Sequence, residues 1–344
     1  MENKTIDQEV KLKPKDFASD QDVRWCPGCG DYSILSQAQK VMPEIGVPKE
    51  KIVWVSGIGC SSRFPYYMST YGFHGIHGRA PAIATGLKLS NPELSVWVAT
   101  GDGDLMSIGG NHFIHTCRKN IDLNILMFNN EIYGLTKGQY SPTSERGKVT
   151  KTTPYGSIDT PFNPISLALG SKATFIARSI DRNPKHLKEV LTKANAHKGT
   201  SFIEIYQNCI IFNDGAFDDL SNKETKEDNV LEMKHGEPLV FGKDNNKGIK
   251  LDGFTPKVVD LTTGEYSLDD LWVHDEFDES QNRAYILSQF HDNPNLPVPI
   301  GVFRQVNSPT LNEELEKQIK FQIEKKGKGN LESLLFSGNT WEVE

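Results

Sequence analysis

The feature that most constrains the fold of this 344-residue chain is an alternation of short β-branched segments with segments of helical spacing, from Trp25 to about Tyr206. Residues 78–90, 107–119 and 183–199 have helical spacing, and the last of them opens with Asn-Pro and closes with Gly, as helices often do. Alternation of this kind is typical of βαβ units, so we expect an α/β fold with a central, mostly parallel sheet flanked by helices. The predicted strands are rich in Val, Ile and aromatic residues: KIVWVSG at 51–57, LSVWVATG at 94–101, LNILMFNN at 123–130, KATFIAR at 172–178 and SFIEIYQ at 201–207.

Changes in composition and periodicity along the sequence divide the chain into three parts. Residues 1–24 are polar and charged, and we expect a tail there. Residues 25–217 carry the alternating pattern and form the predicted main domain. After Asp214 the periodicity fades, so residues 218–344 are predicted to be an extension that packs on the core or on a partner, with hairpin-like turns in 238–253 and a helix at 311–326.

Composition argues against several classes of partner. The 38 basic and 45 acidic residues give a net charge of −7, which is unusual for a protein that binds nucleic acid. No apolar run approaches the ~18–20 residues that a membrane span requires. The first residues are too polar for a signal peptide. We therefore expect neither nucleic acid nor membrane as a partner, and a cytoplasmic location.

Oxygen ligands follow two of the predicted strands. The run 94–101 leads into Gly-Asp-Gly-Asp, and the run 123–130 ends in Asn129 and Asn130. Ligands of open α/β folds bind where the carboxyl ends of parallel strands meet. Asp102, the Asn130 side chain and the Ile132 carbonyl offer the hard oxygens that Mg²⁺ shares with a ligand's phosphates. An ordinary turn is the alternative for the Gly-Asp pair alone, and no G-x-G-x-x-G pattern supports a Rossmann nucleotide site.

Four of the five cysteines lie where they can converge. Cys26 and Cys29 form a C-x-x-C pair, Cys60 follows the first predicted strand, and Cys209 follows the last. Four thiolates can hold a 4Fe–4S cluster or a structural zinc ion. One pair with two distant single cysteines favours the cluster, because zinc more often uses two C-x-x-C pairs. Cys117 falls inside a predicted helix and is expected in the core.

Taken together, these motifs resemble the β subunits of 2-oxoacid:ferredoxin oxidoreductases. The resemblance covers roughly residues 24–217 through WCPGCG, GIGCSSR, HGRA, ATGDGD, NNEIYGLTKGQ and Cys209. It implies a thiamine-diphosphate-binding fold, with Mg²⁺ held by Asp102, Asn130 and Ile132 and a 4Fe–4S cluster held by Cys26, Cys29, Cys60 and Cys209. It also implies that the cofactor is lined by Ile58, Gly59, Cys60, Ser61, His77, Gly78, Arg79, Gly103, Asp104, Gly134 and Leu135.

The family's activity supplies further expectations. It implies oxidative decarboxylation of a 2-oxoacid, with coenzyme A taking the acyl group and ferredoxin taking the electrons. His77 and Arg79 are placed in the catalytic group, because charged donors beside a diphosphate form strong hydrogen bonds. The glutamate that activates thiamine diphosphate comes from an α subunit, or a fused γ–α subunit, in this family. We therefore expect this chain alone to be inactive.

The segment YGLTKGQ bears on the substrate. It is similar to family members that act on 2-oxoglutarate, in which a lysine pairs with the distal carboxylate, and Lys137 occupies that place here. A buried anion requires a cation, whereas the methyl group of pyruvate does not. The alternative for Lys137 is a solvated loop lysine. The alternative functions are a pyruvate or broad-range 2-oxoacid:ferredoxin oxidoreductase, a non-redox thiamine-diphosphate carboligase and a structural zinc protein.

Overall fold

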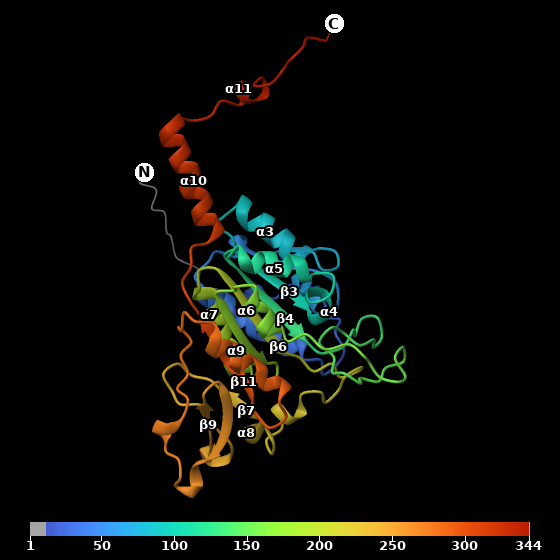
Figure 1. Ribbon diagram of the computed structural model, residues 1–344. Coiled ribbons are helices and arrows are strands. Elements are labelled where there is room, and N and C mark those ends of the chain that lie inside the picture. The colour runs from blue at the N-terminus through green and yellow to red at the C-terminus, as the bar shows by residue number, and fades with distance from the viewer. Residues whose placement is uncertain (1–11, 344) are drawn as a thin grey trace, which may run out of the picture.

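The computed structural model describes residues 12–343. Its main feature is an eight-stranded sheet in the order β2-β1-β3-β4-β6-β5-β11-β7, in which only the pairing of β11 with β5 is antiparallel (Figure 1). A separate three-stranded antiparallel sheet has the order β10-β9-β8. The strands are β1 (Ile52–Ser56), β2 (Tyr71–His74), β3 (Ser95–Gly101), β4 (Leu123–Asn129), β5 (Phe175–Ile180), β6 (Thr200–Tyr206), β7 (Val230–Glu232), β8 (Val240–Phe241), β9 (Lys247–Asp252), β10 (Thr255–Asp260) and β11 (Val298–Gln305).

Helices cover both faces of the large sheet. Alternate residues of a strand point to opposite faces, and in β1 Val53 and Val55 pack towards α3, α5, α6 and α9, while Ile52 and Trp54 pack towards α1 and α7. The α-helices are α1 (Asp31–Val41), α2 (Phe64–Tyr67), α3 (Ala80–Ser90), α4 (Asp102–Leu105), α5 (Gly110–Arg118), α6 (Pro164–Gly170), α7 (Pro184–Ala196), α8 (Lys226–Asn229), α9 (Asn282–Ser288), α10 (Leu311–Lys326) and α11 (Leu331–Leu335). No helix in the described range is long and apolar enough to cross a membrane.

The predicted α/β architecture is confirmed. All five predicted strands are present as β1, β3, β4, β5 and β6, and the three helical segments contain α3, α5 and α7. Cys117 is fully buried on α5, as expected for a core cysteine. The side chain of Asn183 accepts a hydrogen bond from the backbone N–H of His186, and Pro184 occupies the first turn, so the predicted start of α7 is also correct.

The two ends of the chain differ in part from the expectation. The predicted tail at 1–24 lies partly outside the described residues, but within it Phe17 is fully buried against the core. Within the described part of the predicted extension, residues between Leu231 and Phe303 join the hydrophobic core. β7 and β11 also join the large sheet, which the sequence pattern did not indicate. Beyond these strands, α10 coincides with the predicted helix and leads away from the body towards α11 (Figure 1).

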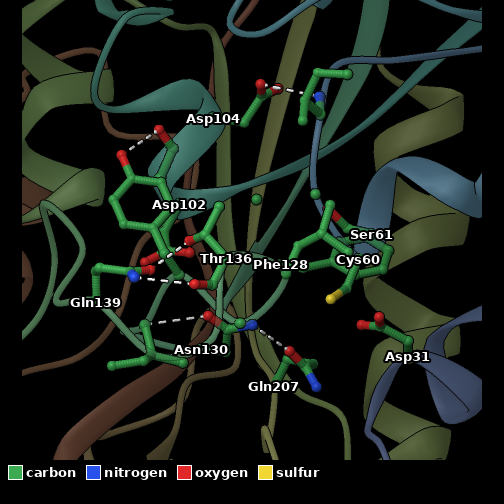
Figure 2. Close-up of a pocket in the computed structure, with 18 of the residues that line it drawn as sticks. Asp31, Cys60, Ser61, Asp102, Asp104, Phe128, Asn130, Thr136, Gln139 and Gln207 are labelled. Carbon is green, nitrogen blue, oxygen red and sulfur yellow. Dashed lines mark hydrogen bonds between the residues drawn. The ribbon is translucent and has the colours of Figure 1, made fainter. Parts of the chain in front are cut away.

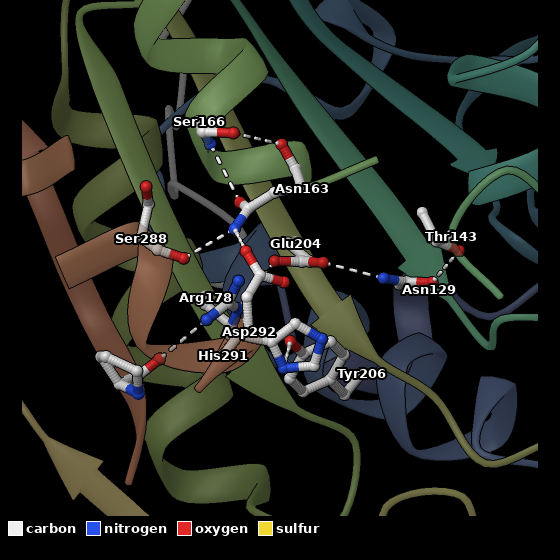
Figure 3. Close-up of polar contacts among 11 residues, drawn as sticks. Asn129, Thr143, Asn163, Ser166, Arg178, Glu204, Tyr206, Ser288, His291 and Asp292 are labelled. Carbon is white, nitrogen blue, oxygen red and sulfur yellow. Dashed lines mark hydrogen bonds and ion pairs between the residues drawn. The ribbon is translucent and has the colours of Figure 1, made fainter. Parts of the chain in front are cut away.

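A buried ion pair joins the extension to the core. Arg178 of β5 and Glu204 of β6 are fully buried and lie 2.7 Å apart (Figure 3). Arg178 also donates to the Pro299 carbonyl at 3.4 Å, and Glu204 accepts from the side-chain amide of Asn129 at 2.8 Å. The pair therefore links β11 of the extension to the end of β4, next to Asn130.

We expect Glu204→Ala to lower the free energy of unfolding by about 3–5 kcal/mol, because Arg178 would remain buried without its counter-ion. The double variant Arg178→Met/Glu204→Leu should lose less of the free energy of unfolding, since neither charge of the pair remains buried. Lys257→Ala, which removes an exposed pair with Asp252, serves as the control and should leave stability nearly unchanged. Urea unfolding measures the stability of all three variants. A similar loss of stability in Lys257→Ala and Glu204→Ala would contradict the role given to the buried ion pair.

Candidate functional site: two adjoining cavities

The predicted site residues follow four strands that are neighbours in the sheet, in the order β1-β3-β4-β6. Cys60 follows β1, Asp102 follows β3, Asn130 follows β4 and Cys209 follows β6. These strands are parallel, so their carboxyl ends meet at one edge of the sheet. Two cavities open there, and Figure 2 shows the larger one.

The larger cavity has a volume of about 660 Å³, a size typical of cofactor sites. Its lining contains most of the residues that were predicted to bind the diphosphate cofactor or the cation. They are Ile58, Gly59, Cys60, Ser61, His77, Asp102, Gly103, Asp104, Asn130, Ile132, Gly134 and Leu135.

Asp104 holds the loops around this cavity together. Its Oδ1 accepts hydrogen bonds from the backbone N–H groups of Ile58 and Gly78 at 3.0 and 2.7 Å and from Nδ1 of His77 at 2.6 Å. Its Oδ2 accepts from the Thr100 hydroxyl at 2.8 Å. With four donors on one buried carboxylate, Asp104 fixes the loops after β1 and β2 against the end of β3.

Two glycines are required by close approaches in the same region. A Cβ on Gly57 would lie 1.9 Å from Oδ2 of Asp104, and a Cβ on Gly103 would lie 2.1 Å from the ring of Tyr133. Any side chain at these positions would displace Asp104 or Tyr133. The glycines therefore shape the cavity wall.

The predicted cation ligands lie together on the cavity wall. Asp102, Asn130 and Ile132 all line it, and they supply a carboxylate, an amide and a backbone carbonyl. Oδ2 of Asp102 accepts hydrogen bonds from the hydroxyls of Ser141 and Thr143, the latter at 2.7 Å. Burial raises the pKa of Asp102 despite these donors. The donor set has the chemistry that Mg²⁺ prefers, and a cation would favour the ionised form of Asp102.

Glu131 adds a second acid, which is partly buried, next to this group. Its backbone has a positive φ of 55°, and burial together with the charge of Asp102 raises the pKa of its carboxyl to about 8. Like charges in a buried site disfavour ionisation. A nearby divalent cation would therefore stabilise both carboxylates.

The smaller cavity, of about 190 Å³, is lined by all four predicted cluster cysteines, Cys26, Cys29, Cys60 and Cys209. Burial raises the pKa values of the thiols of Cys29, Cys60 and Cys209, that of Cys60 to about 12. Thiolates at these positions therefore require a positively charged partner.

Within residues 12–343, no group of three or more His, Cys, Asp or Glu side chains is arranged to hold a single metal ion. A tetrahedral zinc ion would need its four sulfurs in contact with one atom, at about 2.3 Å each. The four cysteines line a cavity of about 190 Å³ together with other residues. Their thiols are the type of ligand that a 4Fe–4S cluster uses.

The two cavities share one wall. Its residues come from three loops and line both spaces: Cys60, Asn130, Gly134, Leu135 and Gln207. These five residues therefore separate the two cavities.

Three predicted residues lie outside the lining of the larger cavity. Gly78, with a φ of 70°, lies behind it and donates to Asp104. Arg79 donates to the Ile108 carbonyl at 3.4 Å. Lys137, with a φ of 78°, lines the smaller cavity, two residues beyond Leu135 in the shared wall.

Several lining residues were not anticipated: Asp31, Gly101, Phe128, Tyr133, Thr136, Gln139, Tyr140 and Gln207. Asp31 is the first residue of α1, two residues after Cys29 of the C-x-x-C segment. Neither of its carboxylate oxygens has a hydrogen-bond partner among the described residues, and burial raises its pKa to about 7. Its position just after Cys29 was a usable signal, whereas nothing in the local sequence marks Gln207.

Comparisons with known proteins identify the family of the chain. Residues 54–205 match the thiamine pyrophosphate enzyme family, C-terminal TPP-binding domain. This range contains Cys60, Asp102 and Asn130 but not Cys26, Cys29 and Cys209. The chain therefore carries a thiamine-diphosphate-binding domain.

Individual relatives identify the family more closely than the domain match does. The chain is 52% identical to 2-oxoglutarate oxidoreductase subunit KorB of Mycobacterium tuberculosis, over 99% of this chain and 90% of that protein. It is 48% identical to the β subunit of 2-oxoacid:ferredoxin oxidoreductase 1 of Aeropyrum pernix, over 55% of this chain and 60% of that protein. A solved structure of 2-oxoglutarate:ferredoxin oxidoreductase from Magnetococcus marinus matches with a TM-score of 0.75 and 32% identity, over 96% of this chain and 97% of that one. The chain belongs to the family of 2-oxoacid:ferredoxin oxidoreductase β subunits.

Proposed function

We propose that this protein is the β subunit of an enzyme that oxidatively decarboxylates 2-oxoglutarate with coenzyme A, giving succinyl-CoA, CO₂ and reduced ferredoxin. The observation that carries the proposal is the shared wall between a cavity of cofactor size and a cavity lined by four cysteines. A carboligase has no need of the second cavity, and a structural zinc protein has no need of the first. The similar enzyme from Magnetococcus marinus was solved with 2-oxoglutarate, coenzyme A and succinyl-CoA bound, which supports the same choice of substrates here.

Thiamine diphosphate is proposed to occupy the larger cavity, with Mg²⁺ held by Asp102, Asn130 and the carbonyl of Ile132. When bound, the cofactor supplies the carbanion and the electron sink for cleavage next to a keto group. The chain's own residues position it. Nδ1 of His77 is engaged by Asp104, so the other ring nitrogen remains for the ligand in the cavity that His77 lines. The positive charge of Arg79, next to His77, adds to the attraction for a diphosphate.

A 4Fe–4S cluster is proposed in the smaller cavity, on Cys26, Cys29, Cys60 and Cys209. When bound, it accepts single electrons, which a zinc ion cannot do. The proposal is supported by four cysteines that line one cavity and by the cost of burying the thiolates of Cys29, Cys60 and Cys209 without a cation. Ferredoxin is the proposed final acceptor. Cluster ligation requires reduced thiols, so we also propose a cytoplasmic location.

An α subunit, or a fused γ–α subunit, is proposed to complete the active site. The acids that line the larger cavity in the described structure are Asp31, Asp102 and Asp104, and no glutamate is among them. Asp104 is engaged by four donors and Asp102 is a proposed cation ligand, so neither is free to activate the aminopyrimidine ring. The family resemblance places the activating carboxylate on the α subunit, so we propose that it comes from that chain and not from Asp31, the remaining acid in the lining.

The purified chain, reconstituted anaerobically with iron, sulfide, thiamine diphosphate and Mg²⁺, should not reduce an artificial electron acceptor with 2-oxoglutarate and coenzyme A. The same chain assembled with its α subunit should reduce ferredoxin under these conditions. The control is the assembled enzyme without coenzyme A. Turnover by the isolated chain would contradict the proposed division of the active site.

Lys137 is the proposed partner of the distal carboxylate of 2-oxoglutarate. It lies on the loop that also carries Leu135 and Thr136, both of which line the larger cavity. The opposite charge would stabilise a second carboxylate as it leaves water. A pyruvate or broad-range enzyme is the alternative, and it would gain little from this lysine.

Lys137→Ala in the assembled enzyme should raise the KM for 2-oxoglutarate by roughly 5- to 150-fold, as expected for the loss of a hydrogen bond to a charged group. The KM for pyruvate, if it is turned over, should change much less. Lys151→Ala, at an exposed position that lines neither cavity, is the matched control. Steady-state kinetics give the KM for both substrates. Equal changes in the two KM values would contradict the role proposed for Lys137.

A further inference from the structure

Gln207 lies in the wall between the two cavities and contacts a predicted ligand on each side. It directly follows β6, is 1% exposed and lines both spaces. Figure 2 shows its side chain next to Asn130 in the larger cavity. Its Oε1 accepts a hydrogen bond from Nδ2 of Asn130 at 2.9 Å. Its Nε2 donates to Sγ of Cys29 at 3.2 Å.

The orientation of the Gln207 amide is fixed by a third contact. Nε2 also donates to the backbone carbonyl of Asn208 at 2.6 Å. A carbonyl oxygen can only accept, so the nitrogen of the amide must lie at this end and the oxygen must face Asn130. The two N–H groups of Nε2 are then both used, one on Asn208 and one on Cys29.

The orientation of the Gln207 amide also determines the orientation of the Asn130 amide. Because Oε1 of Gln207 accepts from Nδ2, the oxygen of the Asn130 amide is directed away, where it accepts from the backbone N–H of Ile132 at 3.2 Å. An amide oxygen has two lone pairs, so one remains for a cation. Gln207 thus presents to the larger cavity the atom that Mg²⁺ prefers.

On the other side, the donor of Gln207 acts on a sulfur. Hydrogen bonds to cysteine sulfurs stabilise the added negative charge of a reduced cluster and raise its reduction potential. We infer that Gln207 is a positioning residue that serves both cofactors at once: it orients Asn130 towards the cation and donates a hydrogen bond to the Cys29 ligand of the cluster. This inference rests on the proposed function of the two cavities.

The test uses Gln207→Met in the assembled enzyme, since methionine has a similar size and donates no hydrogen bond. Mg²⁺ affinity, measured through Mg²⁺-dependent binding of thiamine diphosphate by calorimetry, should fall about 10- to 100-fold. In an anaerobic redox titration followed by electron paramagnetic resonance, the ratio of reduced to oxidised cluster at a fixed potential should fall about threefold to tenfold. A tenfold change corresponds to ~59 mV for a one-electron couple.

Gln37→Met is the matched control, because Gln37 is a buried glutamine on α1 that lines neither cavity. It should change neither quantity. If Gln207→Met does not accumulate in folded form, Gln207→Leu replaces it. A change in only one quantity, or in neither, would overturn the bridging role. A wild-type enzyme with no reducible cluster, or with no Mg²⁺-dependent binding of thiamine diphosphate, would contradict the proposed function itself.

Discussion

The site depends on the meeting of four parallel strand ends at one edge of the sheet. β1, β3, β4 and β6 are neighbours, and each delivers a residue with distinct chemistry to that edge: Cys60, Asp102, Asn130 and Cys209. Parallel pairing places these ends side by side whatever the lengths of the connections between them. The Asp104 carboxylate then fixes the intervening loops through buried hydrogen bonds. Without this topology, the four residues would be scattered over some 150 residues of chain.

Much of the fold could be predicted from local sequence because its central strands are buried on both faces and are therefore mostly apolar. The runs that form β1, β3, β4, β5 and β6 were visible for this reason. β7 and β11 were not. β7 has three residues, and β11 contains Pro299 and Gly301, so neither resembles an ordinary strand. They join the sheet through pairing with each other and with β5, and no local pattern reveals such contacts.

Some site residues could likewise be predicted from the sequence and others could not. Residues within recognisable motifs, such as Asp102, Asn130 and the cysteines, could be found in the sequence, and the structure brings them to two adjoining cavities. Gln207 could not be found, because its role depends on partners 77 and 178 residues away. The position of Lys137 at the smaller cavity likewise depends on the turn of its loop. A sequence motif shows which residues can bind a metal or a cofactor. It does not show which residues lie between two binding sites, because that depends on the tertiary structure.

The central claim is that the second cavity holds a redox cluster within reach of the cofactor in the first. The most direct measurement is the metal content and spectrum of the anaerobically purified assembled enzyme. We predict about four iron atoms per β chain and a broad absorbance in the visible range that bleaches when 2-oxoglutarate and coenzyme A are added. A colourless enzyme with one zinc ion per chain, unchanged by substrate, would contradict the account.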